Sequence, residues 1–356
     1  MTRLALLGYG RFGRALGEMA LDSGFTVRAF DPVASVPERL RAASPEALIR
    51  GAEHIILAVP VRAIRAAALE IRPHLGSGQW VVGVASVMIL PTRDLGEVLG
   101  AAHPWAATHP LFGPTSAALG ERPLTAVVSP NAMHPGAAAE GRRLWERLGC
   151  SVVEQNAEQH DRIMARTHAV AFFLAKGMLE LEEGGPAPVA PPSFQALTRT
   201  IEAVRADASH LFRSIQSDNP FAAEVRGRLL AVLAGIHEEL ATSVGDASAP
   251  GGRLEMPDLG AGVPDLRETR ELIDDTDRDI LRLLARREHL ARRASRAKAS
   301  QGLPVVDPDR ERALRTERRS WAEKEGLDPD VVEAIYRTIL RRSRAVQGDN
   351  SGEEKE

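Results

Sequence analysis

The sequence predicts an N-terminal α/β domain with a mostly parallel sheet, followed by two all-α regions. From residue 2 to about residue 154, short apolar runs alternate with amphipathic segments, and strands that alternate with helices are typical of a parallel sheet. From residue 155 the apolar residues recur at helical spacing, and a stretch rich in glycine, proline and small residues interrupts this pattern at 245–265. We therefore expect domains at 1–154, 155–244 and 266–347, a linker at 245–265, and a disordered, solvated tail at 348–356.

The composition is that of a globular protein with a normal core. The chain has 356 residues, of which 44% are hydrophobic, and its formal net charge of −3 argues against a general nucleic-acid binder. The single cysteine, Cys150, excludes an internal disulfide and fits a reducing compartment. The first residues run directly into a strand pattern without a signal peptide, and the longest apolar run, 80–90, is too short for a bilayer of ~30 Å. We expect a cytoplasmic protein that binds neither nucleic acid nor membrane and carries no metal site.

The α/β pattern consists of apolar runs separated by helical segments. Amphipathic spacing predicts helices at residues 11–23 and 61–74. The first all-α region begins with one long helical segment through residues 160–183, and the run GGPAPVAPP after it predicts a loop. The predicted strands are the runs LALLG, FTVRAF, HIILAVP, WVVGVAS, PWAAT, LTAVVS and SVVE.

A glycine-rich turn, GYGRFG, lies between the first predicted strand and the first predicted helix. Glycines at this spacing allow a tight turn, close approach of the backbone to a pyrophosphate, and close packing of helix on strand. Asp31 ends the second predicted strand, where a carboxylate bonds the ribose 2′-hydroxyl of NAD and repels the 2′-phosphate of NADP. The alternative is a glycine-rich turn beside a solvent-facing Asp31. We expect a Rossmann-like domain whose NAD contacts come from Gly8, Gly10, Arg11, Phe12, Gly13 and Asp31.

The motif HPLFGP, residues 109–114, places a histidine between a predicted strand and a rigid turn. Pro110 and Pro114 fix φ at their own positions and bias the residues before them towards extended geometry, so the segment can hold the His109 side chain in one direction. Taken alone, the motif favours a tight turn with an incidental histidine. Its position after the strand PWAAT changes that interpretation, because open α/β sheets bind ligands at the carboxyl ends of their strands.

These elements together resemble the prephenate dehydrogenase family over about residues 2–240. HPLFGP is similar to the family's motif around the catalytic histidine, VASV with Ser86 to its serine element, and HDRIMARTH to the start of its helical domain. The resemblance implies that His109 is the base for the 4-hydroxyl of prephenate and that Ser86 orients His109 or that hydroxyl. In the third motif it points to His160 and Asp161, and it implies that Thr167 and His168 bind substrate.

The resemblance leaves the substrate carboxylate and the choice of substrate open. The family's carboxylate-binding arginine corresponds to Arg199 in one alignment, and Arg205 is a further candidate. Gly83, Met88 and Ala171 stand where relatives often carry Asp, Lys and His. These departures bear on the choice between prephenate and its aminated analogue arogenate more than on the type of reaction.

The last 80 or so residues carry basic side chains at informative spacings. The segment from residue 266 has an apolar stripe at helical spacing, which by itself predicts a solvated hairpin or coiled coil. Arg287 and Lys298 are three turns apart on one face, about 16 Å along the axis, so two long side chains could hold one small dianion. Arg270 lies about 25 Å from Arg287 on the same measure, so it could reach that ligand only from a partner chain.

This segment resembles the all-helical chorismate mutases, which are intertwined dimers with sites completed across the interface. The similarity runs without a gap from LRETRELIDDTDRDILRLLARR to RRSRAVQ. It implies that Arg270 is lent by the partner, that Lys298 lies on the ether oxygen with Gln347 beside it, and that Asp307 and Glu311 surround the substrate hydroxyl. The expected carboxylate contacts are Arg287, Arg310 and Ser343.

The two resemblances fit one another, because the product of a chorismate mutase is the substrate of a prephenate dehydrogenase. We expect a homodimeric enzyme of tyrosine biosynthesis that binds chorismate and prephenate and uses NAD. Two alternatives stay open: the dehydrogenase acts on arogenate, or the N-terminal half has lost its chemistry and only senses a ligand for the mutase.

Overall fold

The computed structural model describes residues 2–119, 124–181, 189, 191–206, 209–242, 266–304 and 308–349. Its contacts divide the chain into two compact units, one of residues 1–117 and 123–259 and one of residues 118–122 and 260–356. The two regions expected at 1–154 and 155–244 thus pack as one unit. The expected linker lies outside the described residues. In the described ranges, no helix is long and apolar enough to cross a membrane.

The core of the first unit is a mostly parallel sheet. In the described chain its strand order is β2-β1-β3-β4-β5-β6-β7, and strands β1 to β5 are parallel to one another. Strand β6 pairs with β5 in antiparallel and with β7 in parallel orientation. The strands are β1 (Arg3–Leu7), β2 (Thr26–Phe30), β3 (His54–Leu57), β4 (Trp80–Val84), β5 (Trp105–Pro110), β6 (Leu124–Val128) and β7 (Cys150–Glu154).

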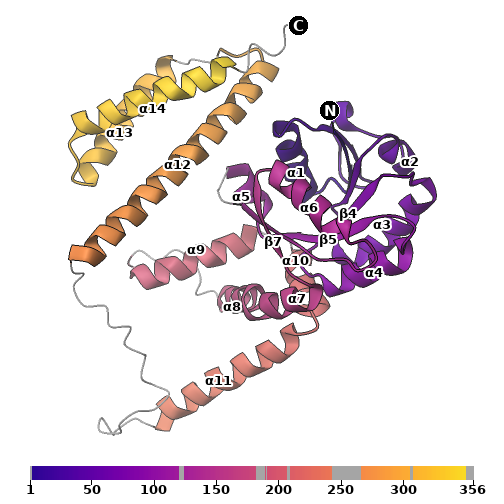
Figure 1. Ribbon diagram of the computed structural model, residues 1–356. Coiled ribbons are helices and arrows are strands. Elements are labelled where there is room, and N and C mark those ends of the chain that lie inside the picture. Colours follow the sequence, from indigo (N-terminus) through magenta and orange to yellow (C-terminus); the bar gives the residue numbers. More distant parts are fainter. Residues whose placement is uncertain are drawn as a thin grey trace. The chain divides into compact units, whose positions relative to one another are not determined.

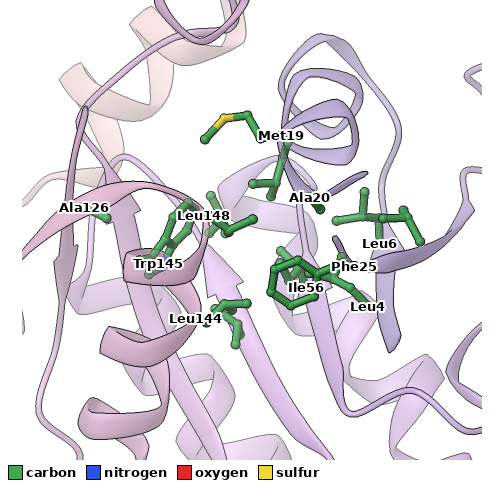
Figure 2. Close-up of a cluster of buried hydrophobic side chains, with 14 of the residues drawn as sticks. Leu4, Leu6, Met19, Ala20, Phe25, Ile56, Ala126, Leu144, Trp145 and Leu148 are labelled. Atoms are coloured by element: carbon green, nitrogen blue, oxygen red, sulfur yellow. The ribbon is translucent and has the colours of Figure 1, made fainter. Parts of the chain in front are cut away.

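The central strands β3, β4 and β5 are almost completely buried because helices cover both faces of the sheet. In β1, Leu4 and Leu6 join one buried cluster, whereas the intervening Ala5 and Leu7 join a second. This alternation follows from the two-residue period of a strand, and burial of both faces is typical of parallel sheets. Figure 2 shows the first cluster, in which side chains from β1, β3, α1 (Arg11–Asp22) and α6 (Gly136–Arg147) meet. The second cluster packs α2 (Pro45–Ile49), α3 (Ile64–Ile71) and α4 (Ile89–Leu99) on the other face.

Prolines divide one predicted helix of this layer. The segment expected as a helix at 61–74 forms three pieces: a 3₁₀ turn Val61–Ala63, α3, and a 3₁₀ turn Arg72–His74. Pro60 precedes the first turn and Pro73 lies within the last, and a proline supplies no N–H for the α-helical ladder. Residues Pro114–Leu119 form the short helix α5 after β5.

Helices complete the first unit. They are α7 (Ala157–Arg166), α8 (His168–Glu180), α9 (Pro192–Ala206), α10 (Ser209–Arg213), a π-helical turn Ser214–Asp218, and α11 (Ala222–Thr242). The single long helix expected through 160–183 is wrong, because the chain breaks between α7 and α8 at Thr167 (φ −111°, ψ −77°), where the Thr167 hydroxyl donates to the Ile163 carbonyl. Most of the expected loop at 184–192 lies outside the described residues.

The second unit contains three described helices, as the sequence predicts: α12 (Leu266–Ser300), α13 (Pro308–Lys324) and α14 (Pro329–Asp349). Prolines open α13 and α14, at the helix position where the missing N–H has no cost. Helix α14 packs against both α12 and α13. It extends to Asp349, two residues into the range expected as a tail.

Candidate active site

A cavity of about 680 Å³ lies at the carboxyl ends of the parallel strands. Each strand contributes the residues that follow it: the glycine-rich turn after β1, Asp31 after β2, residues 58–61 after β3, Ser86 after β4, and His109 at the end of β5. The helical part closes the cavity with Thr167, His168 and Ser214, among others. This is the edge of an open α/β sheet where ligands bind. The structure therefore brings the expected cofactor residues, together with Ser86, His109, Thr167 and His168, into one cavity.

The glycine-rich turn has the geometry of a phosphate cradle. Gly8 has φ +102°, and a Cβ there would lie 2.4 Å from the Ala58 carbonyl oxygen, so no other residue fits. A Cβ on Gly13 would lie 2.2 Å from the Gly8 carbonyl oxygen. A Cβ on Gly10, by contrast, would meet nothing within 4 Å, and Gly10 caps the N-terminus of α1 at the cavity. The free space and the exposed helix N–H groups at Gly10 fit the pyrophosphate of a dinucleotide.

The Asp31 carboxylate is fixed by three backbone N–H donors. Tyr9 N–H donates to Oδ2 over 2.7 Å, and Val33 and Ala34 N–H donate to Oδ1 over 2.8 and 2.7 Å. Burial by itself would raise the pKa of Asp31, but these three hydrogen bonds outweigh it and hold the pKa below its ordinary value. The bond to Tyr9 ties the carboxylate to the glycine-rich turn. Asp31 therefore lines the cavity as a charged, immobile acceptor.

His109 is a strand residue and does not belong to the turn. Strand β5 continues through Pro110, and His109 pairs with Val127 of the antiparallel β6. The extended geometry expected for the residue before Pro110 is confirmed, but His109 lies in the strand and not in the turn, which begins at Leu111, and the ladder to β6 supports it. His109 is 5% exposed. Burial, together with the neighbouring imidazoles of His160 and His168, holds the pKa of His109 well below its ordinary value.

A buried chain of hydrogen bonds leads away from His109. Its Nδ1 lies 2.8 Å from Nε2 of His160, and Nδ1 of His160 lies 2.8 Å from Oδ1 of Asp161. The Asp161 carboxylate also accepts the N–H groups of Met88 and Ile89, at 2.7 and 2.9 Å, at the start of α4. His160 and Asp161 are 0% exposed. The sequence motif HD was noted, but no role for its two residues was predicted, because their contact with a histidine 51 positions away arises only in the folded chain.

His168 stacks beside the base at the first position of α8. Its ring is nearly parallel to that of His109, with 6.2 Å between centroids, and meets the edge of Phe172 at 4.5 Å. Burial, with a smaller contribution from His160, lowers the pKa of His168 from 6.5 to about 4. His168 is thus a neutral imidazole at neutral pH, able to donate or accept a hydrogen bond in the cavity.

Ser86 offers a hydroxyl that the described protein leaves unsatisfied. Its Oγ is buried and has no hydrogen-bond partner among the described residues, so it does not orient His109 as one expectation had it. A buried hydroxyl without a partner costs free energy, which a ligand in the cavity would recover. Thr167 also lines the cavity, although its hydroxyl is bonded to the backbone of α7.

The expected carboxylate-binding arginines lie on α9. Arg199 and Arg205 both fall within this helix, which packs against α8, but their side chains are outside the described residues. Among the described residues that line the cavity, the permanent cation is Arg11. No group of three or more metal-ligating side chains occurs in the described parts of the chain.

The second unit brings two expected residues of its own site together. Arg287 on α12 donates to the hydroxyl of Ser343 on α14, and Ser343 is buried. Arg318 on α13 is a buried arginine that sequence reasoning missed; its guanidinium lies 4.4 Å above the Tyr336 ring. Burial and then the Arg318 charge lower the pKa of Arg287. A half-buried guanidinium and a buried one near one another form an environment suited to a carboxylate.

The other expected residues of the second unit are distributed over its three helices. Arg270 and Lys298 lie on α12 with Arg287, and Arg270 is exposed. Arg310 and Glu311 lie in the first turn of α13, where Arg344 of α14 holds the Glu311 carboxylate with bonds of 2.8 and 2.6 Å. Asp307 and the side chain of Gln347 lie outside the described residues.

Comparisons with known proteins assign the two units separately. The family model for the nucleotide-binding domain of prephenate dehydrogenase matches residues 39–129, and the model for chorismate mutase type II matches residues 269–348. A chorismate mutase from Methanocaldococcus jannaschii is 30% identical over 82 residues, which are 23% of this chain and 83% of that protein. The chain belongs to the chorismate mutase type II family. Its C-terminal unit is a chorismate mutase domain of this type, and residues 39–129 of its N-terminal unit match the nucleotide-binding domain of prephenate dehydrogenase.

Longer relatives share only part of their length with this chain. The T-protein from Enterobacter agglomerans is 36% identical over 87 residues, 24% of this chain and 23% of that protein. Among solved structures, prephenate dehydrogenase from A. aeolicus in complex with hydroxyphenyl propionate and NAD+ has a TM-score of 0.56 and 16% identity, and the match covers 79% of this chain and 98% of that one. This likeness shows that the first unit shares the fold of that protein.

Proposed function

We propose that this chain carries out two consecutive reactions: the rearrangement of chorismate to prephenate, and the oxidative decarboxylation of prephenate to 4-hydroxyphenylpyruvate with NAD. The observation that carries the second reaction is the cavity itself. It places a buried, neutral histidine at the end of β5 in the same space as a glycine-rich dinucleotide cradle. An imidazole base beside a hydride acceptor is what oxidation of an alcohol requires.

In the dehydrogenase unit the nicotinamide, when bound, supplies the hydride acceptor, and the turn at Gly10 and the Asp31 carboxylate would hold its dinucleotide. His109 accepts the proton of the 4-hydroxyl as a hydride leaves the ring carbon that bears this hydroxyl. The bond from the ring to its carboxylate then breaks, carbon dioxide departs, and the electron pair makes the ring aromatic. His109 returns its proton to the phenolic oxygen, so the residue ends the cycle neutral. The free Ser86 hydroxyl bonds the reacting oxygen and keeps it in line with His109.

In the mutase unit no acid, base or nucleophile is needed. The rearrangement of chorismate is pericyclic, so catalysis consists of holding the folded conformer and placing positive charge where the breaking C–O bond becomes negative. Arg287, oriented by Ser343, binds a carboxylate, and Lys298 supplies the point charge at the ether oxygen. The protein supplies electrostatics and shape alone.

One coupled assay tests the whole proposal. Purified full-length chain is given chorismate and NAD, and NADH is followed by absorbance. We expect NADH to appear after a lag, because prephenate must first accumulate, and prephenate supplied directly should remove the lag. Absence of NADH with either substrate would contradict the dehydrogenase assignment.

We propose NAD as the cofactor in preference to NADP because of Asp31. Its fixed carboxylate keeps acceptor capacity for a ribose hydroxyl and repels a 2′-phosphate. The KM for NADP should exceed that for NAD, and Asp31→Asn should narrow the difference. Equal use of both cofactors by the wild-type chain would show that Asp31 does not face the ribose.

Simple measurements distinguish the proposed function of the first unit from two alternatives. If the dehydrogenase unit prefers the aminated substrate, arogenate will be oxidised with a higher kcat/KM than prephenate in a direct comparison. If the unit is only a ligand sensor, isothermal titration will detect no binding of NAD. The unsatisfied Ser86 hydroxyl and the open space at Gly10 favour an active site over a sensor.

We also propose that the chain is a homodimer in which the mutase site is shared. Helix α12 exposes a series of large apolar side chains, and a second copy of this chain would cover them. Arg270 lies on this exposed part of α12, too far along the helix from Arg287 to reach the same ligand. The single cysteine, Cys150, is buried and forms no disulfide, which suits the reducing cytoplasm. The exposed apolar residues are Leu266, Leu272, Ile273, Ile280, Leu281, Leu283 and Leu284.

A further inference from the structure

We infer that His160 and Asp161 are positioning residues, which act through His109 and fix the nitrogen with which it accepts the substrate proton. This inference rests on the proposed dehydrogenase reaction. It assigns a role to the buried hydrogen-bonded chain that joins β5, α7 and the start of α4. Neither His160 nor Asp161 lines the cavity, so neither residue touches substrate or cofactor.

Asp161 is the fixed end of the chain because its carboxylate receives only donors. Met88 N–H and Ile89 N–H are backbone donors whose direction cannot be reversed, and they occupy one oxygen each. Its own backbone carbonyl accepts Nδ2 of Asn219 at 2.8 Å, which ties the residue to the helical layer as well. A carboxylate that accepts N–H groups at the N-terminus of an α-helix is stabilised in its charged form. Asp161 therefore accepts a hydrogen bond from its third neighbour, the His160 ring.

The direction of every later bond follows from that end. Because Asp161 accepts this hydrogen bond, Nδ1 of His160 carries a hydrogen and is the donor. In neutral His160 the other nitrogen, Nε2, is then an acceptor, so Nδ1 of His109 must carry the proton in the bond between them. His109 is left with an unprotonated Nε2. This is the tautomer that can accept a proton from a hydroxyl in the cavity.

The opposite direction would require both nitrogens of His160 to carry a hydrogen, because Nδ1 already donates to Asp161. A doubly protonated His160 would donate to His109 and leave the base with a protonated, useless Nε2. The positive charge of this ring would lie, without solvent, beside the rings of His109 and His168. The charge of Asp161 needs no imidazolium to balance it, because the α4 N-terminus already supplies two N–H donors and the positive end of the helix dipole.

A matched pair of variants separates the two bonds that His160 makes. In His160→Asn the shorter amide replaces Nδ1 and keeps the bond to Asp161 but cannot reach His109. In His160→Gln the amide oxygen replaces Nε2 and accepts from His109. We expect kcat to fall about 10- to 100-fold in His160→Asn, a part of the 10²–10⁴ that a positioned base contributes, and to stay within a few-fold of wild type in His160→Gln. KM and NAD affinity should not change, and the exposed His74→Asn is the control.

A double-mutant cycle distinguishes positioning from a merely structural role. If His160 acts only through His109, then His109→Asn with His160→Asn will lose no more kcat than His109→Asn alone. Additive losses, or a loss in His160→Gln with retention in His160→Asn, would overturn the inference. Chorismate turnover by the same preparations reports that the chain is folded. A wild-type kcat in His109→Asn would contradict the proposed function. A low kcat in His109→Asn together with a normal kcat in His160→Asn would contradict only the positioning role of His160.

The tautomer can also be observed without any turnover. With ¹⁵N-histidine labelling of the ligand-free chain, each imidazole nitrogen reports by its chemical shift whether it carries a proton. We expect His109 to show a protonated Nδ1 and an unprotonated Nε2 at neutral pH, and we expect His160→Asn to lose this preference while His160→Gln keeps it. A protonated Nε2 on His109 in the wild-type chain would overturn the inference, whatever the enzyme's activity.

Discussion

At the scale of single residues, the dehydrogenase site depends on burial of polar groups that would be ordinary on a surface. His109, His160 and Asp161 are almost completely excluded from water, and each is satisfied by the next. Burial keeps His109 neutral, and neutrality is what a base requires. Ser86 is the exception, because its hydroxyl is left for a ligand.

Replacement of the base tests its role directly. His109→Asn should lower the dehydrogenase kcat by about 10²–10⁴, the usual contribution of a positioned general base. NAD binding, measured by titration calorimetry, should barely change, because the glycine-rich turn and Asp31 are separate from β5. If this variant instead unfolds the first unit, as a thermal melt would show, His109 is a structural residue of the strand.

The pH dependence of the reaction should carry the signature of a buried histidine. The base must be neutral, so kcat/KM falls when the pH drops through the pKa of His109. That pKa lies well below 6.5, so we expect the rate to hold constant from neutral pH to below 6.5 and to decline only in more acidic buffer. His109→Asn should lack this acidic decline. A wild-type limb centred above pH 6.5 would contradict the effect of burial described here.

At the scale of elements, one helix organises the mutase unit. Helix α12 is 35 residues long and carries Arg270, Arg287 and Lys298 at separations set only by the helical rise. Helix α14 supplies Ser343 against Arg287, and α13 supplies Glu311 and the buried Arg318. Helix packing thus brings these residues together. The distance along α12 separates Arg270 from Arg287 and Lys298.

The charge at the ether oxygen should matter for rate far more than for folding. Lys298→Ala is expected to remove most mutase activity, by about 10²-fold or more, because Lys298 acts on charge that develops only in the transition state. Circular dichroism should show unchanged helix content, because Lys298 is only half-buried and lies near the end of α12. Near-normal turnover of chorismate in Lys298→Ala would refute this role.

At the scale of the whole molecule, the residues proposed for the two reactions lie in separate units. The residues proposed for the dehydrogenase lie between residues 8 and 205, and those proposed for the mutase lie from residue 270 onward. Loss of one activity by substitution should therefore leave the other in place. In the proposed scheme the two reactions are linked only through prephenate, the product of the first and the substrate of the second.

A mixture of two inactive chains tests the shared mutase site. Chains with Arg270→Ala and chains with Arg287→Ala should each lack activity, whereas a mixed dimer contains one site with both arginines and regains part of it. We expect restoration after mixing and subunit exchange, read as chorismate turnover. Demonstrated exchange without any recovered activity would show that the site belongs to a single chain.

Local sequence predicted well those features that depend on neighbours in the chain. The strands, the glycine-rich turn and the three C-terminal helices were expected from apolar spacing and from glycine placement, and the fold confirms them. The expected long helix through residue 167 failed because a hydrogen bond from Thr167 to Ile163 and a change of ψ are local events that apolar periodicity does not record. The support of His109 was misplaced for a different reason: pairing with Val127 joins residues whose contact no local pattern encodes.

The sequence by itself determined the order of the two units, the type of fold of each, and the residues able to do chemistry, because periodicity, glycine geometry and side-chain type are properties of short segments. Only the tertiary structure decided which of those residues meet. It placed Gly10, Asp31, Ser86 and His109 around one cavity, since parallel strands end at a common edge. It also set His160 and Asp161 behind the base, where the direction of hydrogen bonds from a helix N-terminus decides which nitrogen of His109 is free.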